Sequence, residues 1–170
     1  MILIFDREIY LIERGYRRIA YMGGSATSPA NQIRQMAVQK TLQEAGLAVH
    51  PEWISDGPFS LESGYRRMHE LMQMTPRPDA VFCGSDLIAM GALQFARREG
   101  LQVPGDIAVI GYDNVACASL PLISLTTVEQ PREELGKTAL DALLLEIEHF
   151  PQRTRQRILI EPKLKIRSST

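Results

Sequence analysis

The side chains best suited to bind a small molecule follow short apolar runs in the sequence. Asp113 follows one such run, and Ser85 and Asp86 follow another. Arg34 stands near the start of a predicted helix, and Phe59 lies in the polar segment after a further short run. Carboxylate, hydroxyl and guanidinium groups can pair with ligand hydroxyls, while an aromatic face stacks on an apolar ligand face. These residue types favour a sugar or a nucleoside as ligand.

Several of these residues also have a purely structural interpretation. Asp86 directly precedes Leu87 and is more readily interpreted as the N-cap of a helix than as a ligand contact. Ser85 fits a capping role and a site role equally well. Asp113 could occupy a turn, and Arg34 could be a solvated helical arginine. The position of Asp113 after a buried apolar strand favours the site role.

Motifs for covalent catalysis, phosphate binding and metal binding are absent from the sequence. Gly23-Gly24 does not complete a GxGxxG motif or a P-loop, and neither GxSxG nor HExxH occurs. Cys83 and Cys117 lack the spacing of metal ligands or redox pairs, so we expect small buried or half-buried hydrophobes in a reducing compartment. We therefore expect a protein that is not an enzyme and that needs no cofactor and no metal.

The composition is that of a globular domain with balanced charge. The chain has 170 residues, of which 45% are hydrophobic and 23% charged, and 19 basic residues nearly cancel 20 acidic ones. This length suits one domain or one lobe of a larger protein. A protein that binds DNA by itself usually has a basic surplus, so we expect no DNA binding by this chain alone.

Short apolar runs alternate with segments of helical periodicity along the first two thirds of the chain. The runs cover residues 18–22, 53–54, 80–83 and 107–110. Helical spacing connects them, with apolar positions between Ala30 and Ala45, between Leu61 and Met72, and from Leu87 to Arg98. This alternation predicts an α/β fold with a parallel sheet. Ligands of such sheets bind at the carboxyl ends of the strands, where the polar residues named above would converge.

The last third of the chain departs from this rhythm. Residues 125–128 resemble a strand or a crossing segment, and a helix is predicted from Arg132 to His149. This helix is apolar around most of its circumference, so we expect it to contact protein on more than one side. Two short strands are predicted at residues 158–160 and 164–166, with Pro162 favouring an edge position.

The N-terminus does not indicate a membrane or secretory protein. The apolar stretch Met1–Phe5 ends at Asp6 and is far shorter than the roughly 18 residues of a membrane span. A basic region and a cleavage site of small residues are missing, so it is not a convincing signal peptide. The sequence therefore favours a cytoplasmic protein.

Five motifs in order resemble one family of bacterial regulators. They are LIERGYRRIA at 11–20, PDAVF at 78–82, SDLIAMG at 85–91, VPGDIAVIGYD at 103–113 and LTTVEQP at 125–131. In order and spacing the chain resembles LacI/GalR-type transcription regulators from about Leu11 to Thr170. The resemblance implies the C-terminal part of an effector-binding core. It also implies a three-layer, Rossmann-like lobe of the type I periplasmic binding protein fold.

The resemblance assigns roles to individual residues. Arg34 and Asp113 match positions that bind the effector, and Phe59 falls where the family often places a stacking aromatic. Ser85 stands where many members have asparagine. The loop leading to Arg34 carries Ala30 and Gln32 where other members have polar contacts. The resemblance thus implies effector binding by Arg34, Asp113, Phe59 and Ser85, with a thinner polar network than usual.

The resemblance also implies how the chain is divided. Residues 1–15 would be a remnant of an N-terminal lobe, and residues 16–124 the C-terminal effector-binding lobe. Residues 125–151 would form a crossover strand and an apolar helix that packs on the N-terminal lobe, and residues 152–170 would return to the C-terminal lobe. The apolar helix would leave a large apolar surface in water without that lobe, so we expect the chain to self-associate, or to fold this helix onto its own sheet or onto another copy.

The implied function is effector sensing and dimerisation in a regulator whose DNA contacts come from a helix-turn-helix headpiece outside this chain. Dimer contacts are expected on the helix from Leu87 to Arg98 and on the loop from Val115 to Ser124. The candidate residues are Leu87, Met90, Gly91, Gln94 and Leu120. A sugar-binding component of a transport system shares the architecture and is the alternative. A secretory signal and a complete two-lobed chain would support the transport component.

Overall fold

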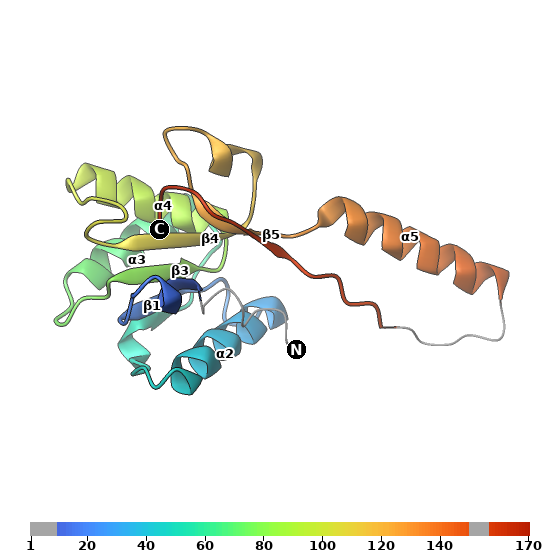
Figure 1. Cartoon of the computed structure of the whole chain (residues 1–170), viewed down its shortest axis with the longest axis horizontal. Helices are drawn as coiled ribbons and strands as arrows, with labels where there is room; N and C mark the ends of the chain where they lie inside the picture. Colours follow the sequence, from blue (N-terminus) through green and yellow to red (C-terminus); the bar gives the residue numbers. More distant parts are fainter. Residues whose placement is uncertain (1–9, 150–156) are drawn as a thin grey trace.

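The computed structural model describes residues 10–149 and 157–170 and shows a sheet between two layers of helices (Figure 1). The predictions for Met1–Phe5 lie outside the described residues. Six strands form the sheet in the order β2-β1-β3-β4-β5-β6. They are β1 (Ile19–Met22), β2 (Ile54–Ser55), β3 (Ala80–Cys83), β4 (Ala108–Asp113), β5 (Thr126–Glu129) and β6 (Lys163–Lys165). The α/β prediction is confirmed.

The sheet is not entirely parallel. Every pair from β2 through β5 is parallel, whereas β6 runs antiparallel to β5, with Val128 opposite Leu164. The predicted parallel arrangement therefore holds for the strands from β2 through β5, and β6 adds an antiparallel edge strand. β6 lies at the edge of the sheet, as Pro162 suggested.

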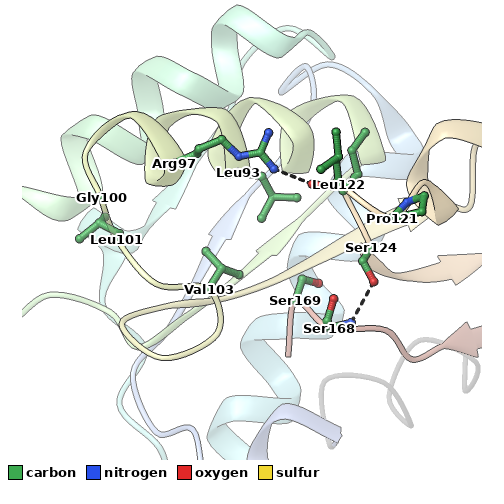
Figure 2. A pocket seen from close by; sticks show the side chains of 11 residues that line it. Leu93, Arg97, Gly100, Leu101, Val103, Pro121, Leu122, Ser124, Ser168 and Ser169 are labelled. Atoms are coloured by element: carbon green, nitrogen blue, oxygen red, sulfur yellow. Dashed lines mark hydrogen bonds between the residues drawn. The ribbon is translucent and has the colours of Figure 1, made fainter.

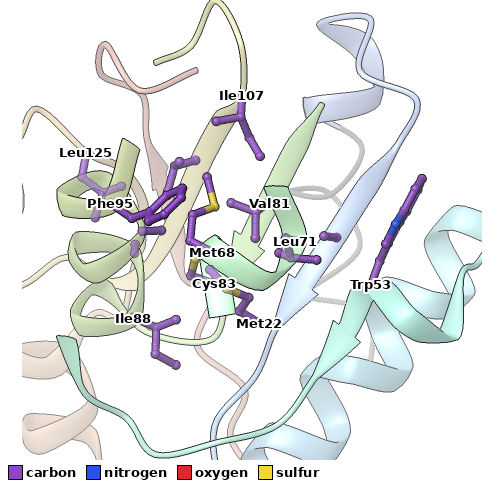
Figure 3. Packing of buried hydrophobic residues seen from close by; sticks show 14 of the residues in the cluster. Met22, Trp53, Met68, Leu71, Val81, Cys83, Ile88, Phe95, Ile107 and Leu125 are labelled. Atoms are coloured by element: carbon purple, nitrogen blue, oxygen red, sulfur yellow. The ribbon is translucent and has the colours of Figure 1, made fainter. Parts of the chain in front are cut away.

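Each face of the sheet is covered by its own helices. They are α2 (Pro29–Glu44) on one face and α3 (Leu61–Met72) and α4 (Asp86–Arg98) on the other, whereas α5 (Arg132–Glu148) does not pack on the sheet. Successive strand residues point to opposite faces. Met22, Val81 and Cys83 therefore pack with Met68 of α3 and Phe95 of α4 (Figure 3), whereas their strand neighbours face Val38 and Leu42 of α2. The buried strands form because their apolar runs are covered on both sides.

The order of the strands reverses between β1 and β3. From β1 the chain passes through α2 to β2 on one side, and β3 and β4 continue on the other side. The helices that lead in these two directions cover opposite faces, so the carboxyl ends of β1 and β3 leave a crevice between them. This topological switch point is the expected place for a ligand.

Helices α3 and α4 cross at two glycines. A Cβ atom on Gly64 would lie 2.1 Å from the carbonyl oxygen of Ile88, and one on Gly91 would lie 2.0 Å from that of Leu61. Gly91 is therefore buried against α3 and does not face outward. The prediction of Gly91 as a dimer contact is wrong, because this position serves close packing inside the lobe.

Three smaller predictions differ from the structure. Trp53 was expected in a strand, but it ends a short 3₁₀ helix at Pro51–Trp53, and the strand begins at Ile54. Residues 158–160 pair with no strand among the described residues, and Ile158 and Leu159 are exposed. Ala30 and Gln32 lie in the first turns of α2 rather than in a loop.

Helix α5 forms at the predicted place but lacks a packing partner within the described residues. It covers Arg132–Glu148, and none of its residues is buried. Figure 1 shows it standing away from the sheet, connected through the segment after β5. Its exposed apolar side chains are Leu135, Leu140, Leu143, Leu144, Leu145 and Ile147. The lobe therefore folds around the sheet without using α5.

Candidate functional site

The loops after β1 and β2 bring Phe59 onto Gly24. A Cβ on Gly24 would lie only 1.8 Å from Cζ of Phe59, so the ring rests directly on the glycine backbone. Asn31 of α2 holds the glycine from below, because its Oδ1 accepts a hydrogen bond of 2.7 Å from the Gly24 amide. The ring of Phe59 remains 38% exposed. It thus presents an open aromatic surface at the rim.

Arg34 spans the switch point. Its Nη1 donates to the carbonyl oxygen of Gly84, at the end of β3, over 2.9 Å. Its guanidinium carbon lies 3.7 Å from the ring centre of Tyr112, at the end of β4, which is cation–π geometry. Arg34 is half-buried, and within the described part of the chain no carboxylate forms an ion pair with it.

Asp113 lies next along β4 with its carboxylate already engaged. Its Oδ1 accepts a hydrogen bond of 2.5 Å from Nε2 of Gln130, in the segment between β5 and α5. The backbone of Asp113 has φ +116°, followed by φ +51° at Asn114, so the chain turns sharply at the sheet edge. Burial raises the pKa of Asp113, and the bond from Gln130 and the positive charges of Arg34 and Arg132 oppose this.

Ser85 takes the capping role that was expected of Asp86. Ser85 is the N-cap of α4, and its Oγ accepts a hydrogen bond from the amide of Ile88. Asp86 is the first residue of the helix, so its prediction as the cap is wrong. Its carboxylate points into the protein, where it accepts hydrogen bonds from the Thr127 hydroxyl (2.5 Å) and the Val115 amide (2.7 Å). Asp86 thus joins α4 to β5 and to the loop that follows β4.

We expect the Asp86→Ala variant to lose about 3 kcal/mol of unfolding free energy. Alanine leaves the Val115 amide without its buried acceptor, and a lost bond to a charged group adds to that penalty. The Asp86→Asn variant is the matched control. Its amide can accept from Val115 and donate to the Thr127 hydroxyl, so we expect a loss of no more than about 1 kcal/mol. Urea denaturation of the two variants and the wild type measures both values.

The stability difference between Asp86→Asn and the wild type should depend on pH. Burial raises the pKa of Asp86, and the bonds from Thr127 and Val115 only partly oppose this. Asp86 then binds its proton more tightly in the folded state than in the unfolded state, where an aspartate has a pKa of about 3.9. The contribution of Asp86 to stability therefore falls as the pH rises from about 4 through the raised value. The stability of Asp86→Asn relative to wild type should increase over that range, and a constant difference would contradict the expectation.

The structure brings the predicted residues to one edge and adds three that the sequence analysis did not single out. Tyr112 stacks on Arg34, and Gln130 donates a hydrogen bond to the Asp113 carboxylate. Asn31 accepts a hydrogen bond from the Gly24 amide and donates one of 2.7 Å to Asp56. Tyr112 and Gln130 lie inside motifs of the regulator family, which was the available signal. Asn31 carried no signal, because a polar residue in a first helical turn is usually solvated.

A separate cavity lies at the opposite edge of the sheet. It has a volume of about 350 Å³ and is lined by the end of α4, the loop before β5 and the C-terminal serines (Figure 2). Arg97 closes part of it by donating to the Leu122 carbonyl. Among the described residues no group of three His, Cys, Asp or Glu side chains could hold a metal ion. The described helices also include none with the length and apolar character of a membrane span.

Comparison with known proteins gives one family. The periplasmic binding protein-like domain matches residues 9–170. The HTH-type transcriptional repressor PurR of Yersinia pestis (strain Pestoides F) is 46% identical over 160 residues, which cover 94% of this chain and 47% of that protein. The chain thus spans about half the length of the curated relatives it matches.

Solved structures of regulators have the same fold. The complex of the transcriptional regulator CelR with cellobiose is 34% identical, with a TM-score of 0.87, covering 96% of this chain and 50% of that one. The lac repressor dimer bound to operator and the anti-inducer ONPF is 26% identical, with a TM-score of 0.86, covering 98% of this chain and 57% of that one.

Proposed function

Because the chain belongs to the periplasmic binding protein-like domain family, in the form found in LacI-family regulators, we propose that it senses a sugar or a nucleoside for such a regulator. The edge formed by Arg34, Phe59 and Asp113 carries this proposal, because it combines an open aromatic face with two charged groups. The chain then acts by binding rather than catalysis, in the cytoplasm.

The chemistry of the edge supports a ligand with hydroxyls. The Asp113 carboxylate can accept two hydrogen bonds from neighbouring hydroxyls, and Arg34 can donate to a third oxygen. Phe59 can stack on the apolar face of a sugar ring or on a base. Ser85 uses its hydroxyl to cap α4, so it contributes less to the site than the asparagine of many members would. The complex of CelR with cellobiose supports a sugar.

Isothermal titration calorimetry with D-ribose, D-glucose, D-galactose, cellobiose, adenosine and guanosine tests this proposal. We expect at least one of them to bind. We expect Asp113→Ala and Arg34→Ala each to weaken that binding by about 10- to 100-fold, because each removes hydrogen bonds to a charged group. Arg98→Ala, at the far end of α4, is the control and should not change it. Unchanged binding in both site variants would show that the site assignment is wrong.

We propose that regulation works through a dimer that uses the outer side of α4 and the loop before β5. Leu87, Gln94 and Leu120 are exposed there, and Met90 is half-buried. Leu122, which is 78% exposed, projects from the same loop. The lac repressor structure, which is a dimer, supports this assignment. Contacts with operator DNA would come from a headpiece outside this chain.

We further propose the division of the chain that the family resemblance implies. Residues 16–124 would form the effector-binding lobe, with residues 1–15 as a remnant of another lobe. Residues 125–151 would cross to that other lobe, where α5 would pack, and residues 152–170 would return. The absence of any buried residue in α5 supports a packing partner beyond the described residues of this chain. Gln130 stands at the start of the crossing, so the Asp113–Gln130 bond would link effector binding to the position of α5.

A further inference from the structure

Arg67 of α3 is buried to an unusual degree for its charge. Only 2% of it is exposed, although arginine side chains are almost never fully buried unless they are paired. Within residues 10–149 and 157–170, its hydrogen-bond partners are backbone carbonyls rather than carboxylates. Its neighbour Arg66 shows the ordinary alternative, an exposed ion pair with Glu70. Arg67 therefore has a role other than ion pairing.

The guanidinium joins the ends of two strands. Nη1 of Arg67 donates to the carbonyl oxygens of Gly23 (2.8 Å) and Ser55 (3.0 Å). Gly23 follows the end of β1, and Ser55 is the last residue of β2. Nε donates to the Ser63 carbonyl over 3.2 Å, which holds the guanidinium against its own helix. One side chain thus fixes α3 to both loops that form this part of the rim.

The loop after β2 rests on the same guanidinium. A Cβ on Gly57 would lie 3.4 Å from Cζ of Arg67, so the backbone of Gly57 passes close over the charged group. The Gly57 amide donates to the carbonyl oxygen of Gly24 over 3.0 Å. Phe59 follows two residues later and covers Gly24. The position of the ring therefore depends on a loop that is held from below by Arg67.

This arrangement is costly for stability. Among the described residues, Nη2 of Arg67 and Oγ of Ser63 are buried and have no hydrogen-bond partner. Burial lowers the pKa of Arg67, because it disfavours the charged form. An apolar side chain of similar length would leave no unpaired Nη2 and no buried charge, and buried charges often contribute little net stability. The benefit of the guanidinium is then its fork of donors, which fixes geometry.

We propose that Arg67 is a positioning residue of the effector site, which holds the loop from Ser55 to Phe59 so that the aromatic ring stays over Gly24. The proposal rests on the proposed function, because the ring matters only if this edge binds the effector. Arg67 itself lies beneath the loop and does not contact the ligand. A residue outside the rim thus determines where the aromatic ring of the rim lies.

Nuclear magnetic resonance of the uniformly labelled chain tests this directly. In the wild type, the Phe59 ring should shift the Hα signals of Gly24 upfield and give nuclear Overhauser effects to them. In Arg67→Met we expect these effects to be lost and the upfield shift to collapse, while amide signals of β3 and β4 stay in place. Arg66→Met, one residue away on the exposed face, is the matched control and should retain both signatures.

A second variant keeps the test decisive if Arg67→Met does not fold. Arg67→Lys retains the charge but not the fork, so it can hold one carbonyl well but not both. We expect the Gly24 shift of Arg67→Lys to fall to less than half the wild-type value and to exceed that of Arg67→Met. Full retention of the shift and the contacts in folded Arg67→Met overturns the proposal. If only Arg67→Lys folds, wild-type signatures in that variant overturn it.

The measurement needs no ligand, so its outcome is separate from that of the calorimetric panel. Failure of every sugar and nucleoside to bind would contradict the proposed function. The resonance data would still test whether Arg67 positions Phe59. Loss of the Gly24 signatures together with normal ligand binding would instead show that Arg67 positions the ring and that the ring does not contribute to recognition.

Discussion

Gly91→Ala is expected to destabilise the lobe by about 3 kcal/mol, although alanine normally stabilises a helix. A Cβ at this position would lie 2.0 Å from the Leu61 carbonyl oxygen and 2.7 Å from the Tyr65 nitrogen, and both are backbone atoms. Backbone atoms cannot rotate away, so α3 and α4 would have to separate. The gain of about 1 kcal/mol from helix propensity is smaller than this cost. Thermal or urea denaturation measures the change.

Gly136→Ala provides the matched control. Gly136 also lies in a helix, but nothing is within 4 Å of a Cβ placed there. Alanine at this position should therefore increase helicity without a steric penalty. If Gly91→Ala proved as stable as the wild type, the close crossing of α3 and α4 would be contradicted. Gly64→Ala should behave like Gly91→Ala, since its Cβ would meet the Ile88 carbonyl at 2.1 Å.

The 170-residue chain is expected to self-associate through α5. Leu140, Leu144 and Ile147 follow one another at helical spacing of four and three residues and are 50–63% exposed. Such a stripe forms a seam that fits the same stripe on a second copy. Soluble monomers rarely leave so large a contiguous apolar surface in water. We therefore expect a second copy of the chain to cover this face of α5.

Light scattering coupled to size-exclusion chromatography, at high micromolar concentration, measures this association. Replacing Leu140, Leu144 and Ile147 together with Gln should weaken it by about 100-fold, since each apolar contact contributes about 1 kcal/mol. Replacing exposed Glu133, Glu134 and Lys137 with Gln serves as a control of equal size on the first turns of α5. A strictly monomeric wild type that binds little hydrophobic dye would contradict the expectation.

The core of the fold could be predicted from the sequence because burial leaves a direct pattern. Residues 80–83 form an unbroken apolar run, and they became β3, which is buried on both faces. The recurrence of Leu61, Tyr65 and Met68 indicated α3 in the same way. The direction of β6 could not be predicted, because side-chain pattern does not distinguish an antiparallel edge strand from a parallel one.

The candidate site was predicted in its parts but not in its connections. The position of Asp113 after a buried strand indicated a place at the sheet edge, and the structure puts it there. Its bond with Gln130 joins residues 17 positions apart, and the contact of Arg34 with Tyr112 joins helix α2 to strand β4. Such contacts depend on side-chain geometry, which a single sequence does not encode locally. Arg67 was hidden for the same reason, since a charged residue on a helix is normally exposed.

The most direct test of the account maps amide shifts as the tightest-binding member of the sugar and nucleoside panel is added to the labelled chain. We expect the largest changes to fall on Gly24, Gly84 and Asn114, around the switch point, and to be much smaller in Asp113→Ala at the same ligand concentration. Largest changes at Gly100, Leu122 and Ser168, around the opposite cavity, would contradict it, because the ligand would then bind away from Arg34 and Asp113.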